Sequence, residues 1–283
     1  MLFKTKDRRG DAQNILRQCQ LVQLYLLEIL DEICKKYGLR YYLDFGTLLG
    51  ALRHNGAIPW DDDLDVSMPL EDYKKFLVLA AGELPRGVLL QTTKNNGGFF
   101  TKISRLRDCK SFYFEEWGSL KEPLGIFLDI YPLIKRRRVP DLPGKLLFEV
   151  RKTAFSSEVG NRIGENYSLK QLWRHATMAT VWRIVDKCAV ICEKVLSIGR
   201  PYCWTQLPGP ASRLRQFDDD DIFPLKMHRY EGRDFPVPQN AEKLLEIYYG
   251  DWRVLPPEEE RNPYAKMKLI LPDRAPKVWW AEN

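Results

Sequence analysis

Residues Tyr42–Arg53 read YLDFGTLLGALR, and after a short loop Ile58–Val66 read IPWDDDLDV. The first stretch predicts a strand over Leu39–Phe45 that ends in a glycine turn, followed by a short helix over Leu48–His54. The second places four acids in five positions, and apolar alternation predicts a strand over Asp63–Met68. The order of strand, glycine turn, helix and acidic strand decides the fold.

The rest of the chain predicts further strands and helices around this centre. Apolar residues recur at helical spacing from Asp11 to Tyr37, and Gly38 ends that run as a C-terminal cap would. Four strands and then three helices are expected at Val88–Thr92, Phe99–Leu106, Ser111–Glu116, Gly125–Tyr131, Gly144–Phe155, Leu169–Ile198 and Ala241–Tyr249. These elements predict an α+β fold with a mixed α/β core built on a mixed β-sheet.

Three parts are expected along the chain. An amphipathic helix over residues 1–38 packs on a catalytic core over residues 39–135, and a helical region over residues 136–283 completes the substrate site. The boundary is placed at the run Lys135–Arg138, because prolines follow it and helical patterns begin there.

Length and composition are those of a folded globular protein. The chain has 283 residues, of which 45% are hydrophobic and 29% charged, so extended disorder and coiled coil are disfavoured. A net charge of +6 suits phosphate-bearing ligands or an anionic membrane surface, and no nucleic acid is expected as a partner. Six cysteines without a C-x-x-C pair, and no recognisable signal or membrane span, predict a reduced cytoplasmic protein. The basic run Lys135–Arg138 beside apolar helices is expected to make weak peripheral contact with the anionic inner face of the cell membrane, and a solvated linker is the alternative.

The acidic strand carries the first candidate site. Asp63 and Asp65 are two residues apart on the predicted strand, so their side chains point the same way, about 6.6 Å apart along the backbone. Two carboxylates at that spacing can converge on a divalent ion, Mg²⁺ or Mn²⁺. Asp61 and Asp62 precede the strand, where they either support this site or form an acidic surface loop.

Three kinds of protein use such an acidic cluster. An EF-hand loop starting at Asp61 requires glycine where this chain has Val66, and Pro59 interrupts the helix that would enter the loop. A nucleotide-sugar glycosyltransferase holds the metal of its donor with an Asp-x-Asp motif, which Asp63 and Asp65 provide. A nucleotidyltransferase fold adds a Gly-Thr turn whose N–H groups bind phosphate, and a third carboxylate from a later strand.

The nucleotidyltransferase pattern is complete in this sequence. Gly46 and Thr47 form the turn that would bind the donor phosphate, and Asp129 is a single acid in the apolar stretch Gly125–Leu133. A strand carboxylate is costly to bury unless it is paired or bound to metal. Asp129 is therefore expected to join the acidic pair.

At these residues the chain resembles the LicD family of phosphotransferases, relatives of the fukutin proteins. The resemblance follows the family's order through Tyr42–Tyr73, Thr101–Asp108, Gly125–Leu133, Phe235–Pro238, Tyr249–Trp252 and Pro256–Pro257. It implies a nucleotidyltransferase-like fold and the transfer of a phospho-alcohol, typically phosphocholine from CDP-choline, to a hydroxyl of a cell-surface glycan precursor with release of CMP. Teichoic acid, lipopolysaccharide and capsule are the acceptor types implied, and similar proteins use ribitol or glycerol donors.

Phosphoryl transfer gives these acids distinct roles. A metal ion held by Asp63 and Asp65 would bridge the donor diphosphate and neutralise charge on departing CMP. Asp129 would complete the metal site and is the candidate base for the acceptor hydroxyl. By its position in the family, Asp44 orders Thr47 or the outer shell of the metal, and the alternative is a buried cap at the strand end.

Basic residues on the next strand are candidate donor-phosphate ligands beside the Gly-Thr turn. Arg105 and Arg107 share a strand face and could clamp phosphate, whereas Lys102 faces the other way from Arg105. Ordinary solvated charges are the alternative for each of the three.

A transferred choline group would add a demand for aromatic side chains. A quaternary ammonium ion donates no hydrogen bonds and is held over ring faces instead. The candidate rings are those of Trp60, Trp117 and Trp252. Packing in the core is the alternative for each ring.

The sequence predicts a metal-dependent enzyme whose partners are CDP-choline or a related CDP-alcohol and a glycan or lipid-linked glycan acceptor. A ribitol- or glycerol-phosphate transferase is the nearest alternative, and an Asp-x-Asp glycosyltransferase is the second. A catalytically idle subunit that binds a cytidylyl ligand is the alternative outside enzymes, and the presence of all three acids disfavours it.

Overall fold

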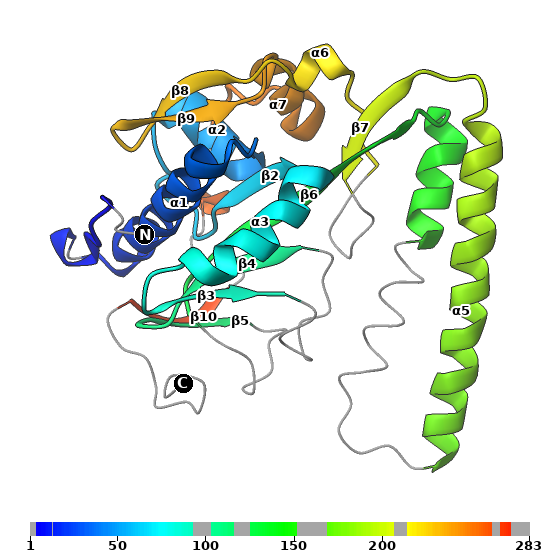
Figure 1. The fold of residues 1–283 in the computed structure, drawn as a ribbon, viewed down its shortest axis with the longest axis horizontal. Coiled ribbons are helices and arrows are strands. Elements are labelled where there is room, and N and C mark those ends of the chain that lie inside the picture. Colours follow the sequence, from blue (N-terminus) through cyan, green and yellow to red (C-terminus); the bar gives the residue numbers. More distant parts are fainter. Residues whose placement is uncertain are drawn as a thin grey trace. The chain divides into compact units, whose positions relative to one another are not determined.

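The computed structural model describes residues 4–12, 14–92, 103–115, 125–151, 169–206, 214–261 and 267–272 (Figure 1). The Cα positions divide the chain into two compact units. Unit 1 contains Met1–Phe99, Ile103–Pro132 and Asp220–Asn283, and unit 2 contains Phe100–Lys102 and Leu133–Asp219. The predicted boundary near residue 135 thus lies close to the start of unit 2, and the residues after 219 return to unit 1.

The elements are those of an α+β protein, as predicted. The helices are η1 (Arg9–Asp11), α1 (Ile15–Tyr37), α2 (Phe45–His54), α3 (Leu70–Glu83), a helix at 141–151, α5 (Leu169–Leu196), α6 (Asp219–Ile222), α7 (Ala241–Tyr249) and η2 (Glu258–Glu260). The strands are β1 (Tyr42–Leu43), β2 (Asp65–Pro69), β3 (Val88–Gln91), β4 (Ser104–Asp108), β5 (Phe112–Glu115), β6 (Phe127–Arg137), β7 (Tyr202–Gln206), β8 (Lys226–Tyr230), β9 (Arg233–Val237) and β10 (Met267–Leu271).

Unit 1 is built on a mixed sheet with the strand order β1-β2-β6-β4-β3. β1 pairs antiparallel with β2, and β4 pairs antiparallel with β6 so that Arg105 lies opposite Asp129. The Asp129 N–H donates to the Leu64 carbonyl at 2.9 Å, just before β2 begins. The two strands that carry the predicted acids are therefore neighbours.

Some strand limits differ from the predicted ones. Asp63 lies in the extended segment that leads into β2, which begins at Asp65. β4 begins at Ser104, and residues 99–102 of the strand predicted over Phe99–Leu106 lie outside the described residues. β6 is longer than predicted because its second half, from Leu133, pairs with β7.

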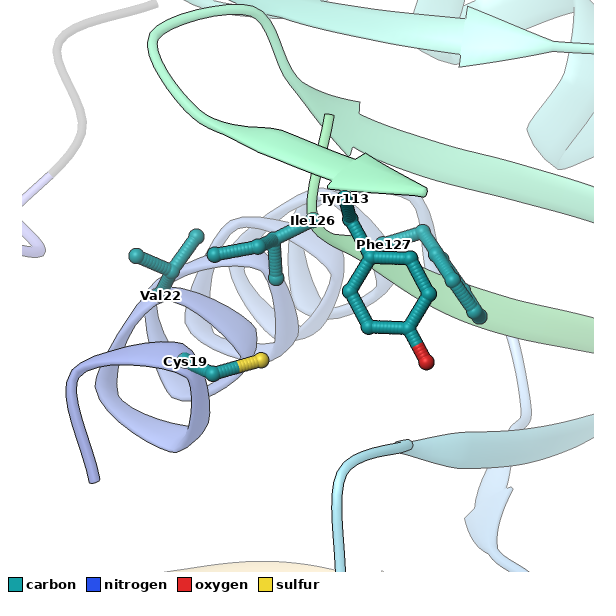
Figure 2. Close-up of a cluster of buried hydrophobic side chains, with 5 residues drawn as sticks. All are labelled: Cys19, Val22, Tyr113, Ile126 and Phe127. Atoms are coloured by element: carbon teal, nitrogen blue, oxygen red, sulfur yellow. The ribbon is translucent and has the colours of Figure 1, made fainter. Parts of the chain in front are cut away.

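α1 is a long helix with a cap at each end. Asn14 Oδ1 accepts the N–H of Leu16 at 2.8 Å, and Gly38 ends the helix in the left-handed conformation at φ 63°. The buried cluster that joins α1 to β5 and β6 consists of Cys19, Val22, Tyr113, Ile126 and Phe127 (Figure 2). Burial of these side chains holds α1 on the sheet.

α2 begins earlier than the sequence pattern predicts. The strand expected over Leu39–Phe45 is reduced to β1, and the helix expected over Leu48–His54 starts at Phe45. The Asp44 carboxylate causes this early start, because it accepts the Phe45 N–H at 2.9 Å as a helix cap. Gly46 and Thr47 therefore form the first turn of α2 rather than a turn before it.

A close backbone approach places the loop after α2. A Cβ atom on Gly50 would lie 2.5 Å from the Gly56 carbonyl oxygen, so only glycine lets the loop fold back against the helix. Glu231, in the turn between β8 and β9, fixes the same loop by accepting the Ala57 N–H at 2.9 Å. The loop then leads directly into the acidic segment.

Unit 2 contains the second half of β6, β7, the helix at 141–151 and α5 (Figure 1). Arg151 joins its two helices by ion pairs with Asp186 at 2.9 Å and Glu193 at 2.8 Å. Of the helices in the described ranges, none is long and apolar enough to span a bilayer.

The basic run Lys135–Arg138 is largely paired within unit 2. Lys135 lies 2.8 Å from Asp219, Arg136 lies 2.8 Å from Glu193, and Arg138 lies 2.5 Å from Asp218. Three of the four basic side chains are therefore paired with acids of unit 2, and the pair of Arg136 with Glu193 is the most buried of these.

Candidate active site

Asp44 is buried at the point where β1 ends and α2 begins. Its carboxylate accepts hydrogen bonds from the Phe45 N–H, from Ser67 Oγ at 2.5 Å and from Tyr248 Oη at 2.8 Å. These three donors come from α2, β2 and α7. Asp44 therefore holds elements together as a buried cap, the structural alternative that the sequence left open.

Gly46 brings the first turn of α2 against the acidic segment. A Cβ atom at this position would lie 2.7 Å from Asp61 Oδ2 and 4.0 Å from Asp63 Oδ1. A side chain here would displace the end of the Asp61 carboxylate, so glycine lets this carboxylate lie against the first turn of α2. The positive end of the helix dipole favours the two carboxylates at this place.

Thr47 fixes the backbone of Asp65. Its Oγ1 accepts the Asp65 N–H at 2.8 Å, and the Asp65 carbonyl accepts the Asp44 N–H at 3.1 Å. Both backbone groups of Asp65 are thus held by residues at the start of α2. The carboxylate itself takes no part in this arrangement.

The acidic segment alternates its side chains between two environments. Asp61 and Asp63 lie beside Gly46, whereas the Asp62 carboxylate is buried and accepts a hydrogen bond from Tyr113 Oη at 2.9 Å. Leu64 is also buried. The alternation expected of a strand thus extends back to Asp61, and Asp62 belongs to the packing of β5.

Two glutamines of α1 hold the backbone of the acidic segment. Gln20 Nε2 donates to the carbonyls of Ile58 at 3.0 Å and Asp61 at 2.9 Å, and Gln23 Nε2 donates to the Asp62 carbonyl at 2.7 Å. Both glutamines are buried. They fix the loop through main-chain carbonyl groups of Ile58, Asp61 and Asp62.

Asp65 is the electrostatic centre of the cluster. Burial raises the pKa of its carboxyl well above the ordinary value, and the nearby acids Asp63, Asp129, Asp61 and Asp44 raise it further. Every charged group that acts on Asp65 in this way is an acid. Like charges gathered at a buried place are unfavourable unless a cation joins them.

Tyrosines surround the same carboxylates. Burial and then the charges of Asp65, Asp129 and Asp63 raise the pKa of Tyr131 well above its ordinary value. The pKa of Tyr249 is raised for the same reasons, with Asp65 as the largest charge. Both phenols are therefore neutral hydrogen-bond donors at the edge of the cluster.

Arg105 pairs with Asp129 across neighbouring strands. Its Nε lies 2.6 Å from Asp129 Oδ1, and both side chains are buried for the most part. The guanidinium also lies over the Phe127 ring, 3.9 Å from its centre. Arg105 thus places a fixed positive charge beside the third predicted acid.

Arg107 shares this strand face, as the alternation predicts, but it has a different environment. Its guanidinium lies 5.0 Å from the centre of the Phe127 ring, and it donates to Gln91 Oε1 and to the Gly125 carbonyl at 2.7 Å. Arg107 is buried, with 3% of its surface exposed, so its predicted role as a phosphate ligand does not match its place inside the sheet. Lys102 lies outside the described residues.

The candidate tryptophans, like the two arginines, have different surroundings. Trp60 is half-buried next to Asp61, and the Arg261 guanidinium lies 5.2 Å from the centre of its ring. Trp252 is buried and has Arg253 at 4.3 Å from its ring centre, which indicates core packing. Trp117 lies outside the described residues. Trp60 is therefore the candidate that has a partly accessible ring beside the acids.

The donor set of the cluster suits a hard divalent cation, which prefers carboxylate oxygens. Asp61, Asp63 and Asp65 supply such oxygens, and their mutual repulsion would be relieved by a positive ion. Within the described ranges, however, no group of three or more Asp, Glu, His or Cys side chains is arranged so that it could hold a metal ion. Asp129 is paired with Arg105 in this structure, and the predicted metal site of Asp63, Asp65 and Asp129 stays a prediction.

Several residues of the site escape prediction from sequence. Gln20 and Gln23 look like ordinary polar residues of an amphipathic helix. Phe45 adopts a left-handed conformation at φ 46°, rare for a non-glycine residue, and its ring lies 5.1 Å from Tyr131 and 5.2 Å from Tyr248. The left-handed backbone conformation is what distinguishes Phe45, and the sequence alone does not show it.

Comparison with known proteins supports the same region as the core of the site. Residues 38–145 match the family described as LicD/FKTN/FKRP, nucleotidyltransferase domain. The lipopolysaccharide cholinephosphotransferase LicD of Haemophilus influenzae is 27% identical over 267 residues, covering 88% of this chain and 95% of that protein. Human ribitol 5-phosphate transferase FKRP is 42% identical over 66 residues, 23% of this chain and 12% of that protein, and mouse ribitol-5-phosphate transferase FKTN is 36% identical over 58 residues, 20% and 13%.

The acidic cluster and the first turn of α2 both lie within the residues that match this family. Residues 38–145 of this chain are therefore similar to a nucleotidyltransferase domain of the LicD kind.

The raised pKa of Asp65 predicts how Asp65→Asn changes stability with pH. The folded protein keeps the Asp65 proton to higher pH than the unfolded chain does, so ionisation costs stability as pH rises above the ordinary aspartate range of about 4. Without divalent ions, Asp65→Asn should therefore unfold at higher urea concentration than the wild type at pH 8. This gain should shrink as pH falls toward 4.

Asp44→Asn is the matched control, because the Asp44 carboxylate is satisfied by three donors and its loss should cost about 1–3 kcal/mol. Added Mg²⁺ should raise the stability of the wild type and leave Asp65→Asn unchanged, since only a protein that binds the ion is stabilised by it. An Asp65→Asn protein that is less stable than the wild type at pH 8 without divalent ions would contradict the electrostatic account.

Proposed function

We propose that the chain transfers phosphocholine from CDP-choline to a hydroxyl of a cell-surface glycan precursor of the teichoic acid, lipopolysaccharide or capsule type, releasing CMP. The observation that carries the proposal is the similarity over 88% of the chain to a lipopolysaccharide cholinephosphotransferase. The similarities to ribitol 5-phosphate transferases cover short segments, so CDP-ribitol or CDP-glycerol is the second candidate donor.

In this reaction the acceptor oxygen attacks the phosphorus of the phosphocholine group, and the bond between that phosphorus and the CMP oxygen breaks. The hydroxyl proton passes to Asp129, which faces the acidic cluster from β6. CMP leaves with the bonding electron pair. Atoms and charges balance without a further reactant.

The other residues bind and orient the donor. The first turn of α2, with Gly46 and Thr47, offers N–H groups at the positive end of a helix to a donor phosphate oxygen. Arg105 lies beside Asp129 and can contact the same diphosphate. Asp61, Asp63 and Asp65 would hold Mg²⁺ or Mn²⁺, which when bound neutralises negative charge on the diphosphate.

The direct test is the release of CMP by the purified chain with Mg²⁺ from a panel of donors. CDP-choline should be turned over faster than CDP-ribitol, CDP-glycerol and nucleotide sugars. Faster turnover of a CDP-polyol would identify the second candidate. If nucleotide sugars were turned over and none of the CDP-alcohols were, the result would indicate a glycosyltransferase and overturn the proposal.

Asp63 and Asp62 offer a matched pair for testing the acidic cluster. Asp63→Asn should lower CMP release by about a hundredfold or more, because a bound metal ion contributes several kcal/mol to stabilising the transition state. Asp62→Asn should keep most of the activity, since its carboxylate accepts a hydrogen bond from Tyr113 and an amide oxygen can do the same. Equal losses in both variants would show that the segment acts only through its fold.

Asp129 and Arg105 can be separated by their effects on kcat and KM. Asp129→Asn should lower kcat by about a hundredfold, the usual contribution of a general base, with little change in donor KM. Arg105→Gln breaks the same ion pair but should act mainly on donor KM. If the two variants lose kcat equally, Asp129 serves only as a partner for Arg105.

Trp60 is the residue through which the choline donor can be recognised. Trp60→Leu should weaken CDP-choline binding about thirtyfold, which corresponds to about 2 kcal/mol for a desolvated cation over an aromatic ring, and should leave CMP binding unchanged. Arg261→Gln is the control, because removing the guanidinium now over the ring frees that face and should not weaken CDP-choline. Parallel loss of CDP-choline and CMP affinity in Trp60→Leu would indicate damaged packing instead.

A further inference from the structure

One face of α5, the long helix of unit 2 (Figure 1), carries a stripe of exposed apolar side chains. Its side chains are spaced alternately by three and four residues, which places them along one face of the helix. They are Val181, Ile184, Cys188, Ile191, Val195 and Ile198, which continues the stripe just after the helix. The aliphatic members are between 51% and 74% exposed, so no other part of unit 2 that the structure describes buries this stripe.

The charges beside the stripe are all basic. Arg183, Lys187 and Lys194 are exposed and are spaced by four and seven residues, which places them along one edge of the stripe. The two acids of this part of α5 are paired with Arg151; Glu193 is buried, and the Asp186 side chain is 41% exposed. The acids are therefore engaged by Arg151, while the basic side chains lie at the surface next to the stripe.

An apolar stripe with a basic edge is the pattern of a helix that lies in the surface of an anionic bilayer. The apolar side chains enter the acyl boundary, and the long basic side chains reach the lipid phosphates. A second copy of the chain would fit less well, because it would offer the same basic edge and no acidic partner for Lys187 and Lys194.

We propose that the outer face of α5 docks the protein onto anionic membrane surfaces, with the helix parallel to the bilayer plane. This assignment differs from the expectation that the run Lys135–Arg138 provides the membrane contact, since three of those four side chains are paired within unit 2. It is independent of the proposed catalytic activity, because it concerns binding of lipid by unit 2.

Flotation of the full chain with vesicles tests this surface. Wild type should float with vesicles of phosphatidylcholine and phosphatidylglycerol at low salt, and much less with phosphatidylcholine alone or at high salt. The double variant Lys187→Gln/Lys194→Gln should lower the partition coefficient about thirtyfold, the effect expected of two basic side chains near such a surface. Ile191→Ser/Val195→Ser should lower it at least tenfold, since both side chains are exposed and their loss leaves the fold intact.

α3 of unit 1 offers matched controls with the same residue types. Lys74→Gln/Lys75→Gln and Val78→Ser alter exposed positions of α3 and should leave flotation unchanged. Equal flotation on neutral and anionic vesicles, or equal effects of the α3 and α5 variants, would overturn the proposal. So would a dimer in light scattering that dissociates in Ile191→Ser/Val195→Ser, because the stripe would then belong to a second copy.

Discussion

Repulsion among the carboxylates of Asp61, Asp63 and Asp65 is the constraint on which the rest of unit 1 depends. Like charges at a buried place separate unless the chain is held around them. Here hydrogen bonds to the main chain hold the acidic segment: Gln20 Nε2 donates to the Asp61 carbonyl, and Thr47 Oγ1 accepts the Asp65 N–H. These contacts hold the backbone of the acidic segment from both sides, so the segment keeps its place although its carboxylates repel one another.

The alternation of side chains made part of the acidic site predictable. It put Asp63 and Asp65 on one face. In the structure Asp61 and Asp63 lie at Gly46, and the charges of both raise the pKa of Asp65. It could not separate Asp61 from Asp62, because both precede the strand. Their separation involves Tyr113, which lies 51 residues from Asp62 in sequence and donates a hydrogen bond to the Asp62 carboxylate.

The start of α2 shows why local patterns were insufficient elsewhere. Gly46 and Thr47 read as a turn, since glycine and threonine are poor in the middle of helices. The helix begins before them because Asp44 caps it, and Asp44 is itself held by Tyr248, 204 residues later in the chain. A contact between residues this far apart in sequence forms only when the whole domain folds. Local residue spacing therefore cannot predict it.

The ion pair between Arg105 and Asp129 connects the resting structure to the proposed reaction. A guanidinium can bind one carboxylate or one phosphate with the same two parallel donors, so a bound diphosphate would compete with Asp129 for Arg105. On the proposed function, the donor would then draw Arg105 toward itself and leave the Asp129 carboxylate available to accept a proton. The same pair that keeps a strand carboxylate satisfied without substrate would thus make its basicity depend on the arrival of the donor.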